Sequence, residues 1–333
     1  MESQAAKTCR QGHRLLPAAL ALLAFTSQAS AAVCRYDNLM PAFLAFEQKT
    51  KDLSPDQRAT LFASDFAPRY KGFYGAMGRV EGVKEYPSAE ELRKDALRLL
   101  DPAHMETLPG FPPLTQAKFE AAAQAVGPDF DKVQAAFSRS FPHFRCPAEI
   151  AFGPSFTHFD GHVYDDENGQ HILFGVDALA ILHHPDEMPA VYAHELFHIY
   201  HREALGKAYP NADGIVWWEM WREGLATYVS QRLNPSLSAQ QVLTFPSDLV
   251  ARMDTPSAKQ RAARLMLADL DTKNTAWFDT MNAISDLPPR TGYYMGYQFA
   301  ASLGREHSLD WLAHLPPARV KREERAFLMA ISR

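Results

Sequence analysis

Apolar residues recur at helical spacing from about residue 40 to 145, with polar residues between them. Two tetrapeptides in this stretch, Ser54-Pro55-Asp56-Gln57 and Ser88-Ala89-Glu90-Glu91, have the Ser-x-x-Gln/Glu form of a capping box. A capping box satisfies free backbone N–H groups at a helix start, so each tetrapeptide predicts the beginning of a helix. We therefore expect region 32–146 to be helical.

The pattern changes between Ala148 and Asp177, where β-branched and aromatic residues flank the sequence Asp165-Asp166-Glu167-Asn168-Gly169. Asn-Gly is a strong short-range hairpin signal, because both residues tolerate the left-handed backbone of a tight turn. A small sheet with a hairpin is expected in this segment.

Helical periodicity returns over residues 185–206 and over about 214–234. Gly206 follows the first segment and Pro235 follows the second, and both residue types commonly stand just beyond a helix end. A further capping box, Ser238-Ala239-Gln240-Gln241, predicts that helices continue toward the C-terminus.

These patterns together predict an α+β, mostly helical fold. We expect helical regions at 32–146 and 235–333, and between them a core at 147–234 in which a small sheet precedes two helices.

The composition indicates a folded protein and argues against one class of partner. The chain has 333 residues, of which 47% are hydrophobic, so it has ample apolar material for a core. Its formal net charge is −5, whereas affinity for nucleic acid comes largely from clustered Lys and Arg. We therefore expect no nucleic-acid partner.

Residues 1–31 have the pattern of a secretory signal peptide. Three basic residues precede the uncharged run Leu15–Phe25, and Ala29-Ser30-Ala31 has the form of a cleavage site. The run is shorter than the ~20 residues that span a bilayer. We therefore expect a secreted, periplasmic protein with no membrane span in the mature chain.

Cleavage leaves two cysteines, Cys34 and Cys146. Disulfides persist in oxidising compartments, so a Cys34–Cys146 disulfide is expected. Two buried free thiols are the alternative.

The most informative residues are His194-Glu195-Leu196-Phe197-His198. Imidazoles four residues apart on one helix lie on the same face, so both can reach one metal ion. A hydrolytic zinc site needs a third protein ligand, and Glu223 on the next predicted helix is the candidate. Its neighbours Gly224 and Ala226 are small enough to let the histidine-bearing helix approach closely. Glu219, one turn earlier, is the alternative ligand, in which case Glu223 would orient a histidine.

These residues resemble the gluzincin zinc metallopeptidases over roughly residues 150–300. The resemblance is to the HExxH…EGxAxY arrangement of the aminopeptidase N-like branch and of short putative zinc-dependent proteases. It implies a gluzincin-like catalytic core with one Zn²⁺ per chain, bound by His194, His198 and Glu223.

The same resemblance implies two catalytic residues. Glu195 is the general base, and Tyr293 of Tyr293-Tyr294-Met295-Gly296 stabilises the tetrahedral intermediate. The Gly-Ala-Met-Glu-Asn sequence by which those aminopeptidases recognise a free N-terminus is absent from the predicted sheet, so endo- and exo-cleavage both stay open.

The expected activity is hydrolysis of a peptide or protein substrate, held as an extended strand by segment 148–177. A zinc hydrolase of a non-peptide amide or acyl bond and a non-catalytic, zinc-stabilised binding protein are the alternatives. His183 and His184 are expected to be partly exposed loop residues or pocket wall. The oligomeric state stays open.

Overall fold

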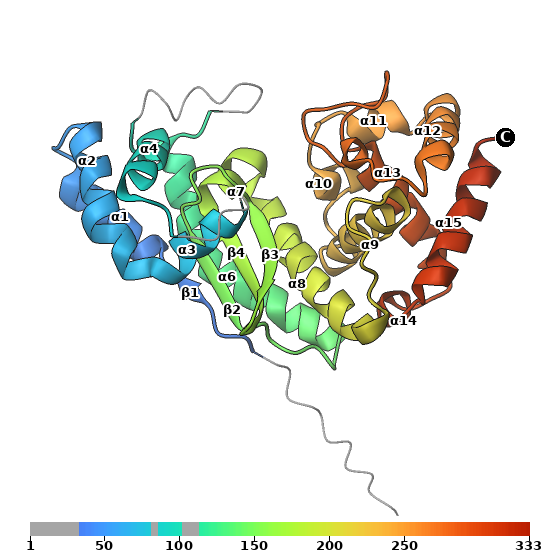
Figure 1. Ribbon diagram of the computed structural model, residues 1–333, viewed down its shortest axis with the longest axis horizontal. Coiled ribbons are helices and arrows are strands. Elements are labelled where there is room, and N and C mark those ends of the chain that lie inside the picture. Colours follow the sequence, from blue (N-terminus) through green and yellow to red (C-terminus); the bar gives the residue numbers. More distant parts are fainter. Residues whose placement is uncertain (1–32, 81–85, 102–112) are drawn as a thin grey trace, which may run out of the picture. The chain divides into compact units, whose positions relative to one another are not determined.

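The structure is a computed structural model that describes residues 33–80, 86–101 and 113–333. The predicted signal peptide, residues 1–31, lies outside these ranges. The described residues form mostly helices and one small mixed sheet, which confirms an α+β, mostly helical fold (Figure 1). No helix within them is both long and apolar enough to cross a bilayer.

The helices before the sheet follow the predicted capping signals. Both Ser54 and Ser88 accept a hydrogen bond from the backbone N–H three residues later, and both capping boxes are complete. A π-helical turn and a 3₁₀ turn at 62–70 connect two of the helices. The α-helices of this region are α1 (Met40–Thr50), α2 (Pro55–Leu61), α3 (Lys71–Val80), α4 (Ala89–Leu100) and α6 (Gln116–Ser140).

The four strands have the order β1-β2-β4-β3. They are β1 (Asp37–Asn38), β2 (Glu149–Gly153), β3 (Gly161–Asp166) and β4 (Gly169–Gly175). The first two pairings in this order are parallel, whereas β3 and β4 form the predicted antiparallel hairpin. Its turn closes between Asp166 and Gly169, whose φ of +127° suits glycine. Because β3 ends the order, it is an edge strand of the sheet that the described residues form.

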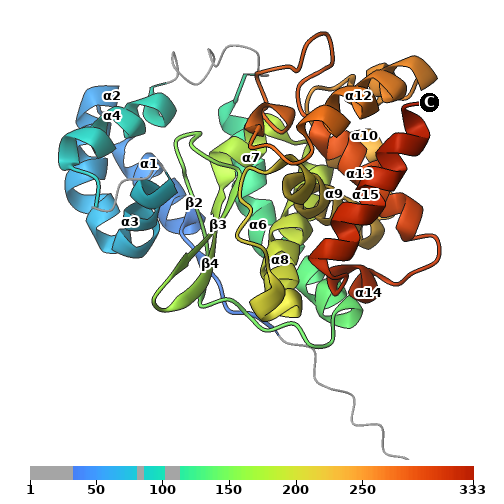
Figure 2. The ribbon, with the colours of Figure 1, turned by 45° about the vertical axis from the view of Figure 1, so that its right-hand side comes forward.

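The predicted helical segments after the sheet are also present. They are α7 (Val176–Leu182), α8 (Met188–Leu205), α9 (Val216–Leu233), α10 (Ala239–Leu243), α11 (Leu249–Met253), α12 (Pro256–Asp269), α13 (Thr291–Leu303), α14 (Leu309–Ala313) and α15 (Pro317–Ile331). Helix α8 contacts β3 and β4 as well as α9, and α9 in turn packs against α13 (Figures 1 and 2).

An aromatic cluster fixes α8 to the sheet. Tyr192 of α8 is fully buried, and its ring centroid lies 5.5 Å from that of Phe152 and 5.0 Å from that of Phe174. Phe130 of α6 contacts all three rings. Burying several aromatic side chains together removes much apolar surface from water, so these contacts hold the α8 helix in place.

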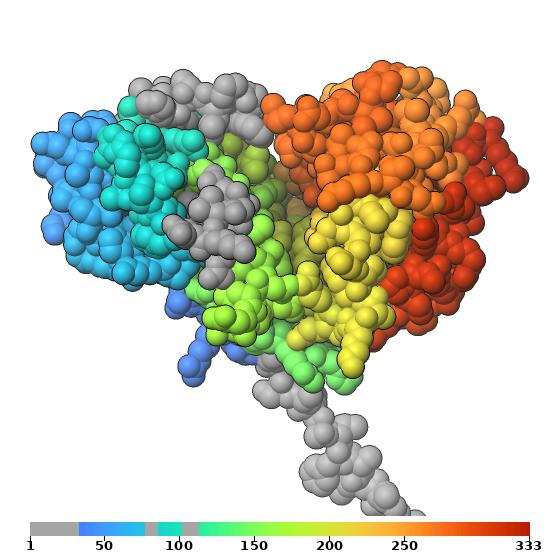
Figure 3. Space-filling model, viewed as in Figure 1, coloured from blue at the N-terminus to red at the C-terminus, as the bar shows by residue number. Residues whose placement is uncertain are grey.

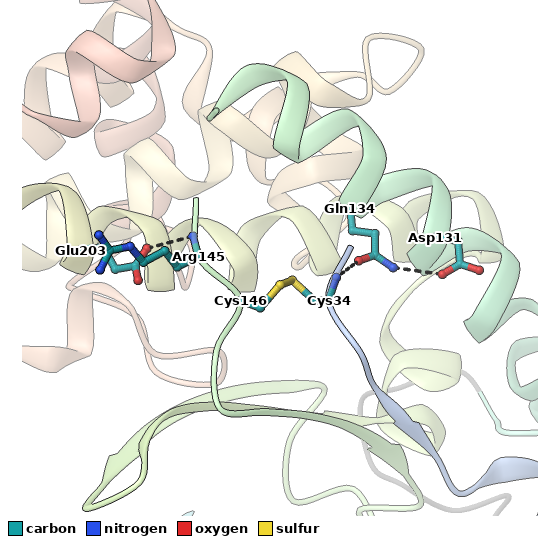
Figure 4. Close-up of a disulfide and its surroundings, with 6 residues drawn as sticks. All are labelled: Cys34, Asp131, Gln134, Arg145, Cys146 and Glu203. Atoms are coloured by element: carbon teal, nitrogen blue, oxygen red, sulfur yellow. Dashed lines mark hydrogen bonds between the residues drawn. A yellow bond between two sulfur atoms is a disulfide. The ribbon is translucent and has the colours of Figure 1, made fainter. Parts of the chain in front are cut away.

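The structure joins Cys34 and Cys146 in a disulfide, with a Cα–Cα distance of 5.3 Å (Figure 4). Cys34 is buried, and its backbone N–H donates to Oε1 of Gln134 at 2.7 Å. The disulfide therefore ties the start of the described chain to the segment that enters the sheet.

Candidate metal centre

His194 and His198 lie on one face of α8, one turn apart, with ring centroids 4.7 Å from each other. The sequence favours a helix start just before them. Pro185–Glu187 forms a 3₁₀ turn, and Pro189 falls in the first turn of α8, where a missing N–H breaks no helical hydrogen bond.

Glu223 of α9 faces both histidines. Its Oε2 is 3.1 Å from Nε2 of His194 and 3.5 Å from Nε2 of His198. The three side chains are 16%, 9% and 8% exposed for His194, His198 and Glu223. Their potential ligand atoms all lie within 4.8 Å of one another. The structure thus brings the three expected ligands together at one point.

Arg222 fixes the other oxygen of Glu223. Its Nη2 lies 3.0 Å from Glu223 Oε1, which leaves Oε2 directed at the histidines. Arg222 also binds Glu219 Oε2 at 2.5 Å, and Glu219 Oε1 accepts the N–H of Gly214 at 2.7 Å. Both oxygens of Glu219 are therefore engaged away from the histidines, which favours Glu223 over Glu219 as the third ligand.

The surroundings set the protonation of these groups. Burial lowers the pKa of His198 to about 4, so this imidazole is neutral at pH 7. Burial opposes ionisation of Glu223, but Arg222 and the two histidines outweigh it and hold its pKa well below the ordinary value. Burial likewise opposes protonation of His194, but its hydrogen bond to Glu223 raises the pKa. A metal ion would compete with that proton.

Glu195 projects toward the edge strand. A Cβ added to Gly161 of β3 would stand only 2.7 Å from Cγ of Glu195, so the two residues are in direct contact. Burial raises the pKa of Glu195 to about 7, and the charges of Asp160 and Glu223 act in the same direction. A carboxylate with this pKa can take up and release a proton near neutral pH.

Tyr293, in the first turn of α13, lines the same cavity as Glu195 and Glu223. Burial raises the pKa of its hydroxyl, and the charge of Glu223 raises it further, so the hydroxyl keeps its proton. It is therefore available as a hydrogen-bond donor.

Gly224 does not face α8, so the expectation that it admits the histidine-bearing helix is wrong. A Cβ on Gly224 would lie 2.1 Å from the carbonyl carbon of Gly296, on α13. A Cβ on Gly296 would lie 2.0 Å from the carbonyl oxygen of Met220. The two glycines let the α9 and α13 backbones touch, and this contact holds Tyr293, one turn before Gly296, close to Glu223.

A cavity of about 400 Å³ contains the centre. Its walls come from β3, α8, α9, α10 and α13 and from the segment leading into α13. Figure 3 shows the face of the molecule where the green part of the chain borders the yellow and orange parts. The residues of these walls include Gly161, His162, Val163, His194, Glu195, His198, Arg222, Glu223, Arg290 and Tyr293.

His183 is a buried part of the cavity wall, whereas His184 is exposed. Nε2 of His183 lies 3.0 Å from Oδ2 of Asp160. Burial favours the neutral carboxyl, but the hydrogen bond and charge of His183 outweigh it and lower the pKa of Asp160 to about 2. Asp160 is therefore a fixed negative charge near Glu195.

His201 is fully buried and separate from the metal centre. Its ring stacks on Phe197 and contacts Trp218, at centroid distances of 5.4 Å for each pair. Burial lowers its pKa to about 3, so it is a neutral core side chain. Trp218 and Trp221 are likewise core residues with no exposed surface.

Asp160, Arg222 and Arg290 are charged residues of this cavity that the sequence did not assign to the site. Arg222 could have been predicted from its position next to Glu223, because a carboxylate that binds a metal commonly also accepts a hydrogen bond from another protein group. Asp160 and Arg290 belong to no motif that carries a metal or catalytic role.

The donor set fits a divalent metal such as zinc, since two imidazole nitrogens and one carboxylate oxygen are typical of hydrolytic zinc sites. Comparisons with protein-family models, curated proteins and solved structures gave no match to this chain.

Proposed function

We propose that this chain is a zinc-dependent peptidase. The convergence of His194 Nε2, His198 Nε2 and Glu223 Oε2 beside Glu195 is the observation that carries the proposal. A purely structural zinc site has four protein ligands and needs no base, whereas three ligands leave a position for water or substrate. Among the described residues only these three form such a group.

Zinc, when bound, supplies a Lewis acid and lowers the pKa of water toward ~7. The chain's own residues supply the proton transfers. The Glu195 carboxylate takes a proton from the water whose oxygen attacks the peptide carbonyl carbon. It then delivers that proton to the amide nitrogen as the C–N bond breaks, so the products are an acid and an amine. The Tyr293 hydroxyl donates a hydrogen bond to the oxyanion that develops during attack.

The edge strand β3 is the proposed substrate support. Gly161, His162 and Val163 line the cavity, and no strand of the described residues pairs with β3 on the side away from β4. An extended peptide can add to such an edge through main-chain hydrogen bonds, which holds it in the same way whatever its side chains. Segment 148–177 thus contributes β3 to the cavity, and a bound peptide would pass beside Glu195.

The disulfide supports the proposed periplasmic or secreted location, because such bonds persist mainly in oxidising compartments.

The proposal is tested by digesting an unbiased peptide library with the purified mature chain in zinc-containing buffer. We expect cleavage products with wild type and none with Glu195→Gln, because this variant keeps the metal ligands and loses the base. Glu203→Gln is the matched control, since Glu203 is an exposed residue of the same helix. It should cleave as wild type does.

Other outcomes of the digest would contradict the proposal or favour one of the alternative functions. Equal cleavage by wild type and Glu195→Gln would contradict the role of Glu195. Hydrolysis of ester or non-peptide amide substrates without any peptide cleavage would point to the alternative zinc hydrolase, and zinc binding with no hydrolysis at all would point to a binding protein.

A further inference from the structure

The charged groups of the cavity differ in whether they already have partners. Arg222 is paired with Glu219 and Glu223, and Asp160 accepts from His183 and from the backbone N–H of Gly161. Both side chains are therefore already paired with groups of the protein. Glu195 acts as the general base in the proposed function.

Arg290 is different. No carboxylate of the described residues lies within 4.0 Å of its guanidinium, so it forms no ion pair with that part of the chain. Its Nε is buried and has no hydrogen-bond partner in the part of the chain that the structure describes. A buried donor without a partner costs free energy, and a bound anion would remove that cost.

The position of Arg290 is held by its surroundings. Its guanidinium carbon lies 4.1 Å from the ring centroid of Tyr293, over the face of that ring. Its own backbone N–H donates to the carbonyl of Asp279 at 3.1 Å, and its φ is +59°, a left-handed conformation that is uncommon for a non-glycine residue. Its charge is close enough to Asp160 and His194 to interact with both.

From this geometry we infer that Arg290 is a specificity-determining residue that binds a carboxylate of the substrate. The inference rests on the proposed peptidase function, because carboxylates are the only anionic groups of an unmodified peptide. Two sources share this chemistry, namely the C-terminal α-carboxylate and an Asp or Glu side chain. A guanidinium suits either source, since it can donate two parallel hydrogen bonds to the two oxygens.

The test measures binding of N-acetylated peptides to the mature Glu195→Gln chain in zinc-containing buffer, where no turnover obscures the affinity. One peptide pair has neutral side chains and differs only in a free or amidated C-terminus. The other pair is amidated and differs only in one internal Glu or Gln. We expect the anionic member of at least one pair to bind roughly 10- to 100-fold more tightly, and the pair that shows this identifies the source of the carboxylate.

Adding Arg290→Gln should bring that ratio close to one, and Arg290→Lys should restore part of it. Arg305→Gln is the control, because Arg305 is exposed just beyond the other end of α13. It should keep the full ratio.

If Arg290 is present and the two members of each pair bind with equal affinity, the inference is wrong. It is also wrong if none of the peptides binds. A ratio that survives Arg290→Gln would overturn it as well. Failure of the peptidase proposal is a separate result, namely that wild type does not cleave the peptides that the Glu195→Gln chain binds.

Discussion

Replacing Gly161 with Ala tests whether the position of Glu195 matters separately from metal binding. Gly161 has no positive φ, so alanine is compatible with its backbone. The added Cβ would stand 2.7 Å from Cγ of Glu195 and 2.9 Å from its Cδ and Oε1. These atoms belong to a flexible side chain, so Glu195 can move aside without unfolding the protein.

The size of the effect follows from the distances. Carbon atoms in contact prefer a separation of about 3.5–4.0 Å, so the Glu195 side chain must retreat by roughly 1 Å. A misplacement of about 1 Å costs on the order of 100-fold in rate, which corresponds to ~2.7 kcal/mol of transition-state stabilisation. The metal ligands are not touched, so zinc content should not change.

The assay is kcat/KM on a peptide identified in the library digest, together with zinc content and the free energy of unfolding. We expect kcat/KM to fall about 100-fold, with zinc content near that of wild type. Gly75→Ala is the control, because a Cβ there would meet the ring of Tyr86 at an ordinary 3.5 Å. If Gly161→Ala retained kcat/KM within about twofold of wild type, the contact between β3 and Glu195 would not matter for catalysis, and the reasoning would be refuted.

Three predictions concern stability. Gly224→Ala should lower the free energy of unfolding by about 3 kcal/mol or more, because the added Cβ would lie 2.1 Å from the Gly296 backbone. A loss of less than about 1 kcal/mol, measured by denaturant titration, would contradict this contact. Cys146→Ser should lower the free energy of unfolding by up to ~4–5 kcal/mol, since the disulfide closes a span of 112 residues, and an intact mass unchanged by reductant would show that the cysteines are unpaired. Glu324→Met should raise it by roughly 1–3 kcal/mol at pH 7, because Glu324 is fully buried and neither of its carboxylate oxygens has a hydrogen-bond partner within residues 33–80, 86–101 and 113–333. Burial raises the pKa of Glu324 well above its ordinary value, so wild type loses stability as the pH rises above that ordinary value. The difference in free energy of unfolding between Glu324→Met and wild type should therefore grow from pH 5 to 8. A difference that stayed constant over this range would refute this account.

Local signals predicted the elements that carry the centre. Gly206 and Pro235 lie at or just beyond the ends of α8 and α9, and the hairpin turn closes next to Asn168 as expected. The i, i+4 spacing of His194 and His198 fixes their common face whatever surrounds the helix. These features depend on neighbouring residues only, which is why sequence suffices for them.

The rest of the site depends on contacts between distant segments. Asp160 becomes part of the cavity only because β3 packs on α8, and Arg290 because α13 lies against α9. The prediction that Gly224 contacts α8 is wrong for the same reason, because a small residue indicates that another helix comes close but does not identify that helix. The two-residue strand Asp37–Asn38 is too short to produce any periodic pattern.

The central claim is that His194, His198 and Glu223 hold one zinc ion. It is tested most directly by elemental analysis of the purified mature chain as wild type, Glu223→Ala and Glu219→Ala. We expect about one zinc per chain in wild type, a large loss in Glu223→Ala, and a smaller loss in Glu219→Ala, which acts through Arg222. Full zinc content in Glu223→Ala together with an empty Glu219→Ala would contradict the claim and transfer the ligand role to Glu219.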